Sequence, residues 1–216
     1  MFKNRTHAGS LLMPLLQDLQ LKNPLVIGIP RGGVEVASPI ARGIQAPLYV
    51  IIPRKIGAPF NPEYAVGAVA PDGTVSYDET LLNYLGLIPQ DMEKVIQREK
   101  QEIAKRTHLY GKWGTLPDLK NYMVILVDDG IATGYTVKAA LSSLRKQTTN
   151  PIILAVPVLP EDVVSSFESL VDKLIYLHAP IDFRAVGQFY EDFSEISHEA
   201  VLNILEETNK KVTCHE

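Results

Sequence analysis

The chain has 216 residues, of which 46% are hydrophobic and 21% are charged. These are ordinary globular values, and the length suits one domain with a sizeable core. A net charge of −4 argues against a general nucleic-acid binder, and no apolar run is long enough to cross a membrane. The single cysteine, Cys214, has no partner for an internal disulfide, so we expect a reduced, cytoplasmic location.

Apolar periodicity predicts an alternation of helices and strands along the chain. Apolar side chains recur at helical spacing near the N-terminus, on both sides of Pro14, and predict an amphipathic first helix. Because strands that alternate with helices form parallel sheets, we expect an α/β fold, an open parallel sheet flanked by helices. The expected strands are residues 25–29, 48–52, 123–127, 152–158 and 174–177, and the expected later helices are residues 34–42, 89–110, 137–145, 161–170 and 197–207.

The segment after the second expected strand interrupts this alternation. Its sequence predicts a loop at residues 53–62, followed by the two strands of a hairpin at residues 63–70 and 74–77. Asp72-Gly73 between these strands is typical of a type I′ turn. We therefore expect a hairpin inserted between the second and third strands of the parallel sheet.

Other charged residues give weaker signals. The long helix expected at residues 89–110 carries acids such as Glu99 beside bases such as Arg106, which predicts a solvated, salt-bridged surface. The histidines show no metal-ligand spacing. Neither pattern predicts a functional site.

Residues 122–137, with the sequence YMVILVDDGIATGYTV, hold the strongest functional signal. An apolar strand ends at Asp128 and Asp129, in the position where open α/β sheets bind ligands. A short loop then leads into a helix, whose free backbone N–H groups suit a phosphate. Acids beside a phosphate loop indicate a sugar phosphate, because its hydroxyls would donate hydrogen bonds to the carboxylates. The loop residues are Ala132, Thr133, Gly134, Tyr135 and Thr136.

This segment resembles the ribose 5-phosphate signature of the type I phosphoribosyltransferases, in which two acids precede A-T-G-x-T. Gly130 departs from the signature, because the family has a branched aliphatic residue there. The resemblance implies the type I phosphoribosyltransferase fold, with an inserted hairpin and a C-terminal cap, called the hood. It implies one domain over residues 1–216, with a core at about 20–178, a flexible insertion at about 56–112 that is most mobile over 56–77 without ligand, and a hood at about 179–193 followed by the last helix.

Two further loops leave expected strands at the same edge of the sheet. The sequence PRGG at residues 30–33 resembles the family's pyrophosphate loop, in which the peptide beside the basic residue is often cis. We therefore predict a strained peptide at 30–31 or 31–32. Arg54 and Lys55 begin a stretch that resembles the R-K-x-G-x-x-P of adenine phosphoribosyltransferases. A plain tight turn and a solvated loop are the alternatives for these two segments.

The resemblance implies transfer of the 5-phosphoribosyl group from 5-phosphoribosyl 1-pyrophosphate to a nitrogenous base or amine, with release of pyrophosphate, as in nucleotide salvage. Asp128 and Asp129 would accept hydrogen bonds from the ribose hydroxyls and meet a Mg²⁺ ion, directly or through water. The loop at residues 132–136 would bind the 5-phosphate. The resemblance assigns pyrophosphate binding to Arg31, Gly32, Gly33, Arg54 and Lys55, and catalysis to Asp128, Asp129, Arg31 and Lys55.

The acceptor base would lie against the hood. Phe183, Phe189 and Tyr190 would stack on a planar ring, although aromatic residues at this spacing are more often part of a core. Glu63 resembles an acid near the base or the reaction centre in some members, and an exposed acid at a strand start is the alternative. The habit of the family favours a homodimer.

A regulatory module that senses the donor or a nucleotide without chemistry is the alternative function. Such a module usually carries a DNA-binding domain or a basic RNA surface, which this acidic chain does not suggest. Arg31, Arg54 and Lys55 favour catalysis, because a nucleotide sensor has less need of a pyrophosphate site. Dinucleotide-binding and P-loop domains are disfavoured, because neither GxGxxG after the first strand nor GK[ST] occurs.

Overall fold

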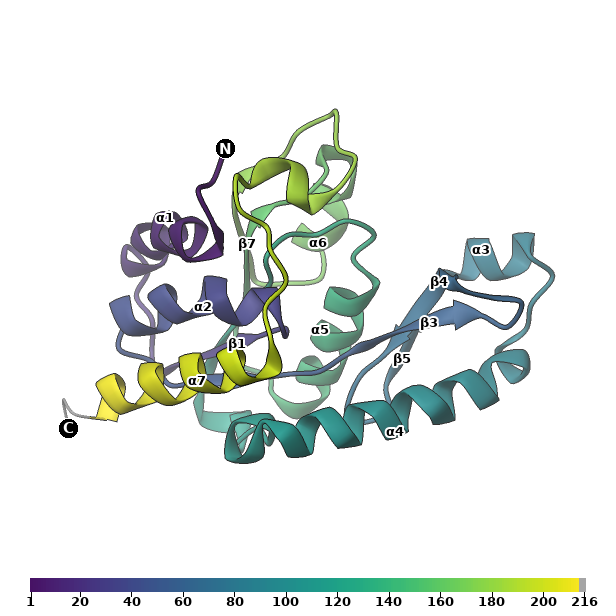
Figure 1. Ribbon diagram of the computed structural model, residues 1–216, viewed down its shortest axis with the longest axis horizontal. Coiled ribbons are helices and arrows are strands. Elements are labelled where there is room, and N and C mark those ends of the chain that lie inside the picture. Colours follow the sequence, from purple (N-terminus) through teal and green to yellow (C-terminus); the bar gives the residue numbers. More distant parts are fainter. Residues whose placement is uncertain (214–216) are drawn as a thin grey trace.

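A central sheet of five parallel strands organises the computed structural model, which describes residues 1–213 (Figure 1). Cys214, on which the disulfide expectation rests, lies outside the described residues. The strand order is β2-β1-β6-β7-β8, which confirms the open parallel sheet. Gly28 lies beside Val127 in register, so β1 and β6 end level and their following loops share one edge. The strands are β1 (Pro24–Gly28), β2 (Leu48–Val50), β6 (Met123–Val127), β7 (Ile152–Val158) and β8 (Lys173–His178).

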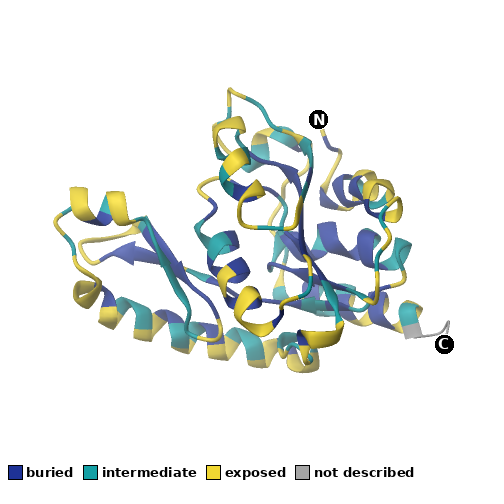
Figure 2. Cartoon of the chain, turned by 180° about the vertical axis from the view of Figure 1, so that it is seen from behind, coloured by how far each residue is buried: buried dark blue, intermediate teal, exposed yellow. Residues whose placement is uncertain are grey.

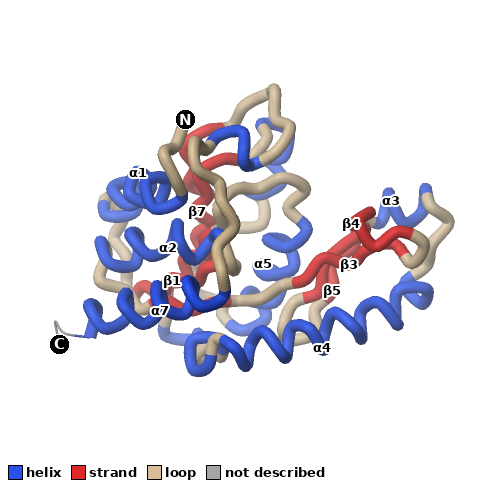
Figure 3. The backbone as a smooth tube through the Cα atoms, viewed as in Figure 1, coloured by secondary structure: helices blue, strands red, loops and turns tan. Residues whose placement is uncertain are grey.

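Helices cover both faces of this sheet (Figures 1 and 3). Along β6, Ile125 and Val127 face the layer of α1, α2 and α7, whereas Val124 and Leu126 face α5 and α6. Burial on both faces explains why this strand is apolar throughout, and Figure 2 shows the buried strands between helices with exposed outer faces. The helices are α1 (Arg5–Gln17), α2 (Gly32–Gly43), α5 (Tyr135–Gln147), α6 (Val164–Glu168) and α7 (His198–Thr213).

The insertion between β2 and β6 is a second small sheet with its own core. Its strands pair antiparallel in the order β3-β4-β5, and α4 runs along them back toward the parallel sheet (Figure 3). Ile56, Val66, Val69 and Ile103 are among the residues buried between this sheet and its helices. The elements are β3 (Arg54–Ala58), β4 (Asn61–Val69), β5 (Val75–Tyr77), α3 (Glu79–Tyr84) and α4 (Glu93–Leu109), with a 3-10 turn (Pro89–Met92) before α4.

Two local predictions in the insertion are wrong. The expected loop at 53–62 contains strand β3, because Ile56 and Ala58 are buried in the insertion's core, and only the flanking prolines suggested a loop. The hairpin turn is not type I′. Its central residues are Pro71 and Asp72, since the Gly73 N–H donates to the Ala70 carbonyl at 2.9 Å.

This turn follows from the fixed backbone of Pro71. Pro71 suits the first central position of an ordinary turn, whereas a type I′ turn over Asp72-Gly73 would need positive φ at both residues, and Asp72 does not have it. Gly73 alone takes the left-handed conformation, with φ of 83°, after the turn. The result is the three-residue hairpin loop in which a glycine follows an ordinary turn.

The N-terminal segment and the hood lie together above the sheet. The Phe2 N–H donates to the Phe189 carbonyl at 2.7 Å, and the Phe2 carbonyl accepts from the Glu191 N–H at 2.8 Å. Phe2 is buried beside Tyr190, with ring centroids 5.2 Å apart. These contacts bring the start of α1 to the edge of the sheet that holds the acid pair. Among the described residues, no helix has both the length and the apolar character needed to cross a membrane.

Candidate functional site

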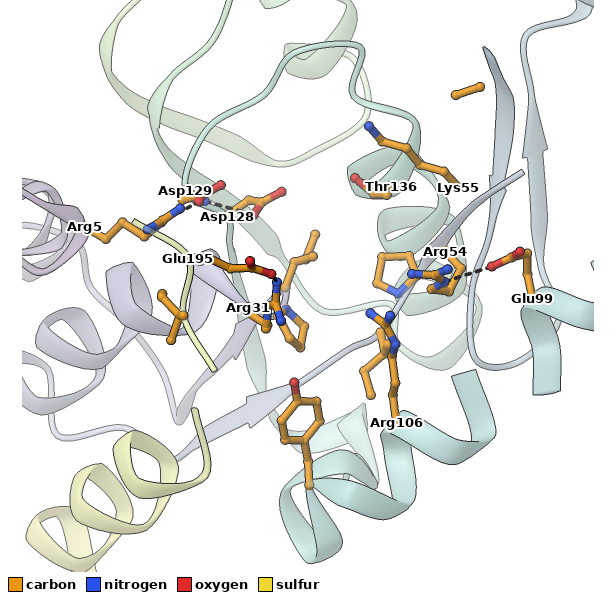
Figure 4. Close-up of a pocket in the computed structure, with 18 of the residues that line it drawn as sticks. Arg5, Arg31, Arg54, Lys55, Glu99, Arg106, Asp128, Asp129, Thr136 and Glu195 are labelled. Carbon is orange, nitrogen blue, oxygen red and sulfur yellow. Dashed lines mark hydrogen bonds and ion pairs between the residues drawn. The ribbon is translucent and has the colours of Figure 1, made fainter. Parts of the chain in front are cut away.

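A cavity of about 660 Å³ lies between the edge of the parallel sheet and the insertion (Figure 4). The acid pair reaches it from the end of β6, and Arg31 reaches it from the loop after β1. The start of β3 contributes two cations, and the first turn of α5 contributes a hydroxyl. The structure thus brings together these residues predicted from separate segments: Asp128, Asp129, Arg31, Gly32, Arg54, Lys55, Glu63 and Thr136.

The two glycines after β1 are required by close approach to the acid pair. A Cβ at Gly32 would collide with Oδ2 of Asp129, and a Cβ at Gly33 would lie 2.7 Å from the Val127 carbonyl oxygen. The start of α2 therefore fits directly against the end of β6. The Pro30–Arg31 peptide bond is cis, one of the two peptides predicted to be unusual.

The two carboxylates of the acid pair are partly buried, and their pKa values are raised. Burial, followed by the neighbouring charge of Asp129, raises the pKa of Asp128 well above its usual range. Burial also raises the pKa of Asp129, against the opposing effect of the Arg5 guanidinium. Asp128 forms no ion pair with another residue among 1–213. A ligand with hydroxyl donors or a cation would stabilise the charged form of this carboxylate.

Arg5 completes the pair's surroundings and was not predicted. Its Nε donates to Oδ2 of Asp129 at 2.7 Å, and its Nη1 donates to the Ser194 carbonyl at 2.9 Å. The guanidinium also lies 3.8 Å from the centre of the Phe193 ring. No motif in the sequence signals this role, because only the tertiary fold brings the first turn of α1 to the end of β6.

The two arginines that the sequence predicts to bind pyrophosphate are already paired with acids. Arg31 forms an ion pair with Glu195, which follows the hood. Arg54 donates through Nε to Glu99 on α4 at 2.9 Å. Glu99 is buried, with 5% of its surface exposed, so the interpretation of this helix as uniformly solvated is wrong. Arg106 also corrects that interpretation, because it lines the cavity from the same helix.

The predicted phosphate loop is divided between two hollows. Thr136 faces the large cavity, whereas Ala132 and Thr133 line a neighbouring hollow of about 450 Å³. Helix α5 begins two residues earlier than expected, at Tyr135, after Gly134 with φ of 73°. Its free N–H groups thus point from the first turn of a full helix, where the dipole favours an anion.

Tyr135, the variable residue of A-T-G-x-T, links helix α5 to the insertion by a hydrogen bond. Its hydroxyl donates to Asp78, the N-cap of α3, at 2.8 Å. Burial and this carboxylate raise the pKa of Tyr135 to about 12, so the phenol stays protonated at neutral pH. The contact fixes the second sheet against α5.

The predicted hood aromatics take structural positions. Phe183 and Phe189 stack on each other with centroids 5.5 Å apart. Tyr190 is buried, and its hydroxyl donates to the Asp129 backbone carbonyl at 2.6 Å. This hydrogen bond fixes the backbone that carries the acid pair. Of Phe183, Phe189 and Tyr190, Phe183 lines the smaller hollow. A fourth aromatic residue, Phe193, lines the large cavity beside Arg5.

Gly130, the departure from the signature, is explained by the hood. Its φ is 154°, and a Cβ there would lie 2.5 Å from a methyl group of Val186. A branched side chain at this position would therefore push the hood away from β6. The departure reflects local packing and leaves the acid pair in place.

The donor atoms around the pair suit a hard divalent cation held jointly with a ligand. Two carboxylates supply oxygen ligands, and no group of three or more His, Cys, Asp or Glu side chains within residues 1–213 would form a complete protein cage. Mg²⁺ is commonly bound by one or two carboxylates together with substrate phosphates and water. The residues fit that mode of binding, with Asp128 and Asp129 as the ligands.

Comparisons with known proteins identify the family that the chain is similar to. The profile of the phosphoribosyl transferase domain matches residues 5–165. A Mycobacterium tuberculosis H37Rv protein with the provisional name of a phosphoribosyl transferase is 36% identical over 210 residues, which cover 97% of this chain and 47% of that protein. The chain thus spans about half the length of the curated relatives it matches.

Solved structures share the fold. The TT1426 protein of Thermus thermophilus is 39% identical, with a TM-score of 0.80 over 95% of this chain and 98% of that one. The AQ2163 protein of Aquifex aeolicus is 12% identical, with a TM-score of 0.51 over 81% of this chain and 74% of that one. The second likeness concerns the fold alone.

Proposed function

Because the chain belongs to the phosphoribosyltransferase family, we propose that it transfers the 5-phosphoribosyl group of 5-phosphoribosyl 1-pyrophosphate to a nitrogenous base or amine in nucleotide salvage, releasing pyrophosphate. One observation carries the proposal. An acid pair, a helix N-terminus and a set of arginines, which belong to distant segments of the chain, line one cavity. That combination matches the chemistry of a sugar that carries a phosphate at one end and a pyrophosphate at the other.

Each part of the donor has a matching group. The Thr136 hydroxyl and the N–H groups at the start of α5 would bind the 5-phosphate. Asp128 and Asp129 would accept hydrogen bonds from the ribose hydroxyls. Arg31, Arg54 and Lys55, with the backbone of the two glycines after Arg31, would bind the pyrophosphate, since guanidinium groups match phosphate oxygens in charge and geometry.

The reaction needs no protein nucleophile. As the bond from C1 to pyrophosphate breaks, positive charge develops on the ribose ring and negative charge on the leaving group. In the proposed arrangement, the carboxylates of Asp128 and Asp129 would stabilise the charge on the ribose, and the cations Arg31 and Lys55 would stabilise the charge on the leaving group. Mg²⁺, held by the acid pair, would add charge neutralisation of the pyrophosphate when bound.

The acceptor would enter between the insertion and the hood. Glu63 on β4 lines the large cavity, where its carboxylate would accept a proton or a hydrogen bond from an acceptor nitrogen. Phe183 lines the smaller hollow beside the phosphate loop and offers a flat apolar surface. Phe189 and Tyr190 would act by supporting this surface.

The test combines binding with turnover. Purified protein is titrated calorimetrically with 5-phosphoribosyl 1-pyrophosphate and Mg²⁺, and pyrophosphate release is then measured across a panel of bases and amines. The double variant Asp128→Asn with Asp129→Asn should lose measurable donor binding while remaining folded. Asp118→Asn changes an exposed acid that does not line the cavity and is the matched control.

Three outcomes are distinguishable. Binding with release for one acceptor supports the proposal and names that acceptor. Binding without release for any acceptor would replace it by the regulatory alternative. Donor binding of unchanged strength in the double variant would show that the ribose site is assigned to the wrong residues.

A further inference from the structure

Helix α4 presents a functional face to the cavity. Glu99, Arg106 and Tyr110 are spaced by seven and four residues, so they lie on one side of the helix. All three line the cavity. Glu99 binds Arg54, and the Tyr110 hydroxyl is 2.6 Å from Nδ1 of His198 on α7. The helix thus forms a wall of the site, although its sequence is mostly polar.

Unlike Glu99 and Tyr110 on this face of the helix, Arg106 has no bonded partner among the described residues that would explain its position. Its guanidinium is half-buried and forms no hydrogen bond or ion pair with another residue in the described range 1–213. Glu102, one turn earlier on α4, is bonded to Lys105 at 2.7 Å instead. A half-buried cation that lines a cavity without a bonded acid is a candidate binding group for an anion.

Its neighbours make the need for an anion stronger. In Figure 4 the side chains of Arg54 and Arg106 lie next to each other, Arg31 lies across from them, and Thr136 and Lys55 lie higher in the view. Burial, and then repulsion from Arg54, lowers the pKa of Arg106. Arg31 and Arg106 also help to lower the pKa of His198, after burial. Arg54 and Arg31 thus repel the Arg106 guanidinium, and an anion bound between these groups would relieve that repulsion.

We propose that Arg106 binds the leaving pyrophosphate, so that the inserted helix α4 completes the leaving-group side of the donor site. The inference rests on the proposed function. Arg106 would donate to oxygens of the pyrophosphate from the side opposite Arg31, and would share its charge with Arg54. Three guanidinium groups around one diphosphate match its several oxygens, since each fork can bind two of them. The 5-phosphate is the less suitable ligand, because Thr136 and the N-terminus of α5 lie away from Arg106 (Figure 4).

The experiment compares two partial ligands. Dissociation constants for inorganic pyrophosphate with Mg²⁺ and for ribose 5-phosphate are measured by calorimetry in wild type, Arg106→Gln and Arg106→Lys. Lys94→Gln is the matched control, because it removes a cation from an exposed position on the same helix that does not line the cavity. Thermal unfolding of each variant verifies the fold.

We expect Arg106→Gln to weaken pyrophosphate binding by about tenfold or more, as for loss of a charge-assisted hydrogen bond to a phosphate. Ribose 5-phosphate binding should stay unchanged, Arg106→Lys should recover part of the loss, and Lys94→Gln should behave as wild type. A purely structural role would weaken both ligands together and would overturn the inference.

Failure of this inference differs from failure of the proposed function. If wild type and Arg106→Gln bind pyrophosphate equally while the donor still binds, Arg106 is not a pyrophosphate residue and the proposed function stands. If wild type binds neither the donor nor ribose 5-phosphate, the proposed function fails, and the inference fails with it.

Discussion

Replacing Glu195 by glutamine should tighten binding of the donor. In the free protein this carboxylate pairs with Arg31, which the proposed mechanism assigns to pyrophosphate. The donor must therefore displace Glu195 before it can use Arg31. The Glu195→Gln variant keeps the shape of the side chain and removes its charge, so that Arg31 becomes available and the repulsion between Glu195 and the anion disappears.

The magnitude follows from the exposure of the pair. The Arg31 and Glu195 side chains are 33% and 77% exposed, so water and salt screen their attraction. Exposed pairs contribute about 0.2–1 kcal/mol, which corresponds to a factor of roughly 1.4–5 in Kd. Repulsion of the incoming anion acts in the same direction, since unit charges about 4 Å apart in water interact by about 1 kcal/mol. We therefore expect a Kd roughly two to ten times lower.

The assay is a calorimetric titration with 5-phosphoribosyl 1-pyrophosphate and Mg²⁺ at low and at high salt. The advantage of the variant should shrink at about 0.5 M salt, where exposed charges are screened over a few ångströms. Glu191→Gln is the control, because it removes a charge from an exposed hood residue that does not line the cavity. An unchanged or higher Kd for Glu195→Gln at low salt would refute the reasoning that Glu195 competes with the donor for Arg31.

Three further predictions concern the elements around the site. Tyr135→Phe removes the hydrogen bond to Asp78. Amide exchange over residues 56–77, the segment expected to be mobile without ligand, should become faster, because the free energy of local opening falls by about 0.5–1.5 kcal/mol. Hydrogen bonds from Leu81 and Tyr135 lower the pKa of Asp78. The stabilisation by the charged carboxylate is therefore present above the ordinary pKa of about 4 and is lost as the pH falls. The difference in amide exchange between wild type and Tyr135→Phe should shrink at that low pH. Gly33→Ala should lower the free energy of unfolding by about 1–3 kcal/mol in chemical denaturation, because the new Cβ would meet the backbone of β6. Pyrophosphate should raise the pKa of His198 in an NMR titration. The reason is that the anion offsets the positive charges of Arg31 and Arg106, which together with burial lower that pKa in the free protein. A His198 pKa that stays constant on binding would show that the anion binds elsewhere.

The parts of the site that could be predicted from the sequence are those fixed by local chain geometry. A buried parallel strand is apolar at every position, and its end must lie at the ligand-binding edge of the sheet, so Asp128 and Asp129 were accessible to prediction. The two glycines after Arg31 could be predicted only by resemblance to a pyrophosphate loop, with a plain tight turn as the alternative. The structure adds the reason, which is contact of Gly32 and Gly33 with the end of β6.

The parts that could not be predicted depend on contacts between distant segments. Arg5 belongs to a helix whose sequence predicts only an apolar face, and the tertiary fold alone brings it to Asp129. Glu99 and Arg106 lie in a run of acids and bases in which a buried pair looks the same as a solvated one. Asp72-Gly73 shows the converse case, because this local pattern predicted a type I′ turn, whereas the chain turns at Pro71 and Asp72 instead.

The ion pairs of the free protein connect the proposed donor site to three peripheral elements of the molecule. Asp129 is paired with Arg5 of α1, Arg31 with Glu195 after the hood, and Arg54 with Glu99 of the insertion. Each pair joins a group that the donor would use to a different peripheral element. A donor that replaces these partners must therefore alter the contacts of the hood and the insertion in the same step. Because the acceptor would enter between those two elements, we expect the donor to bind first and to prepare the acceptor's place.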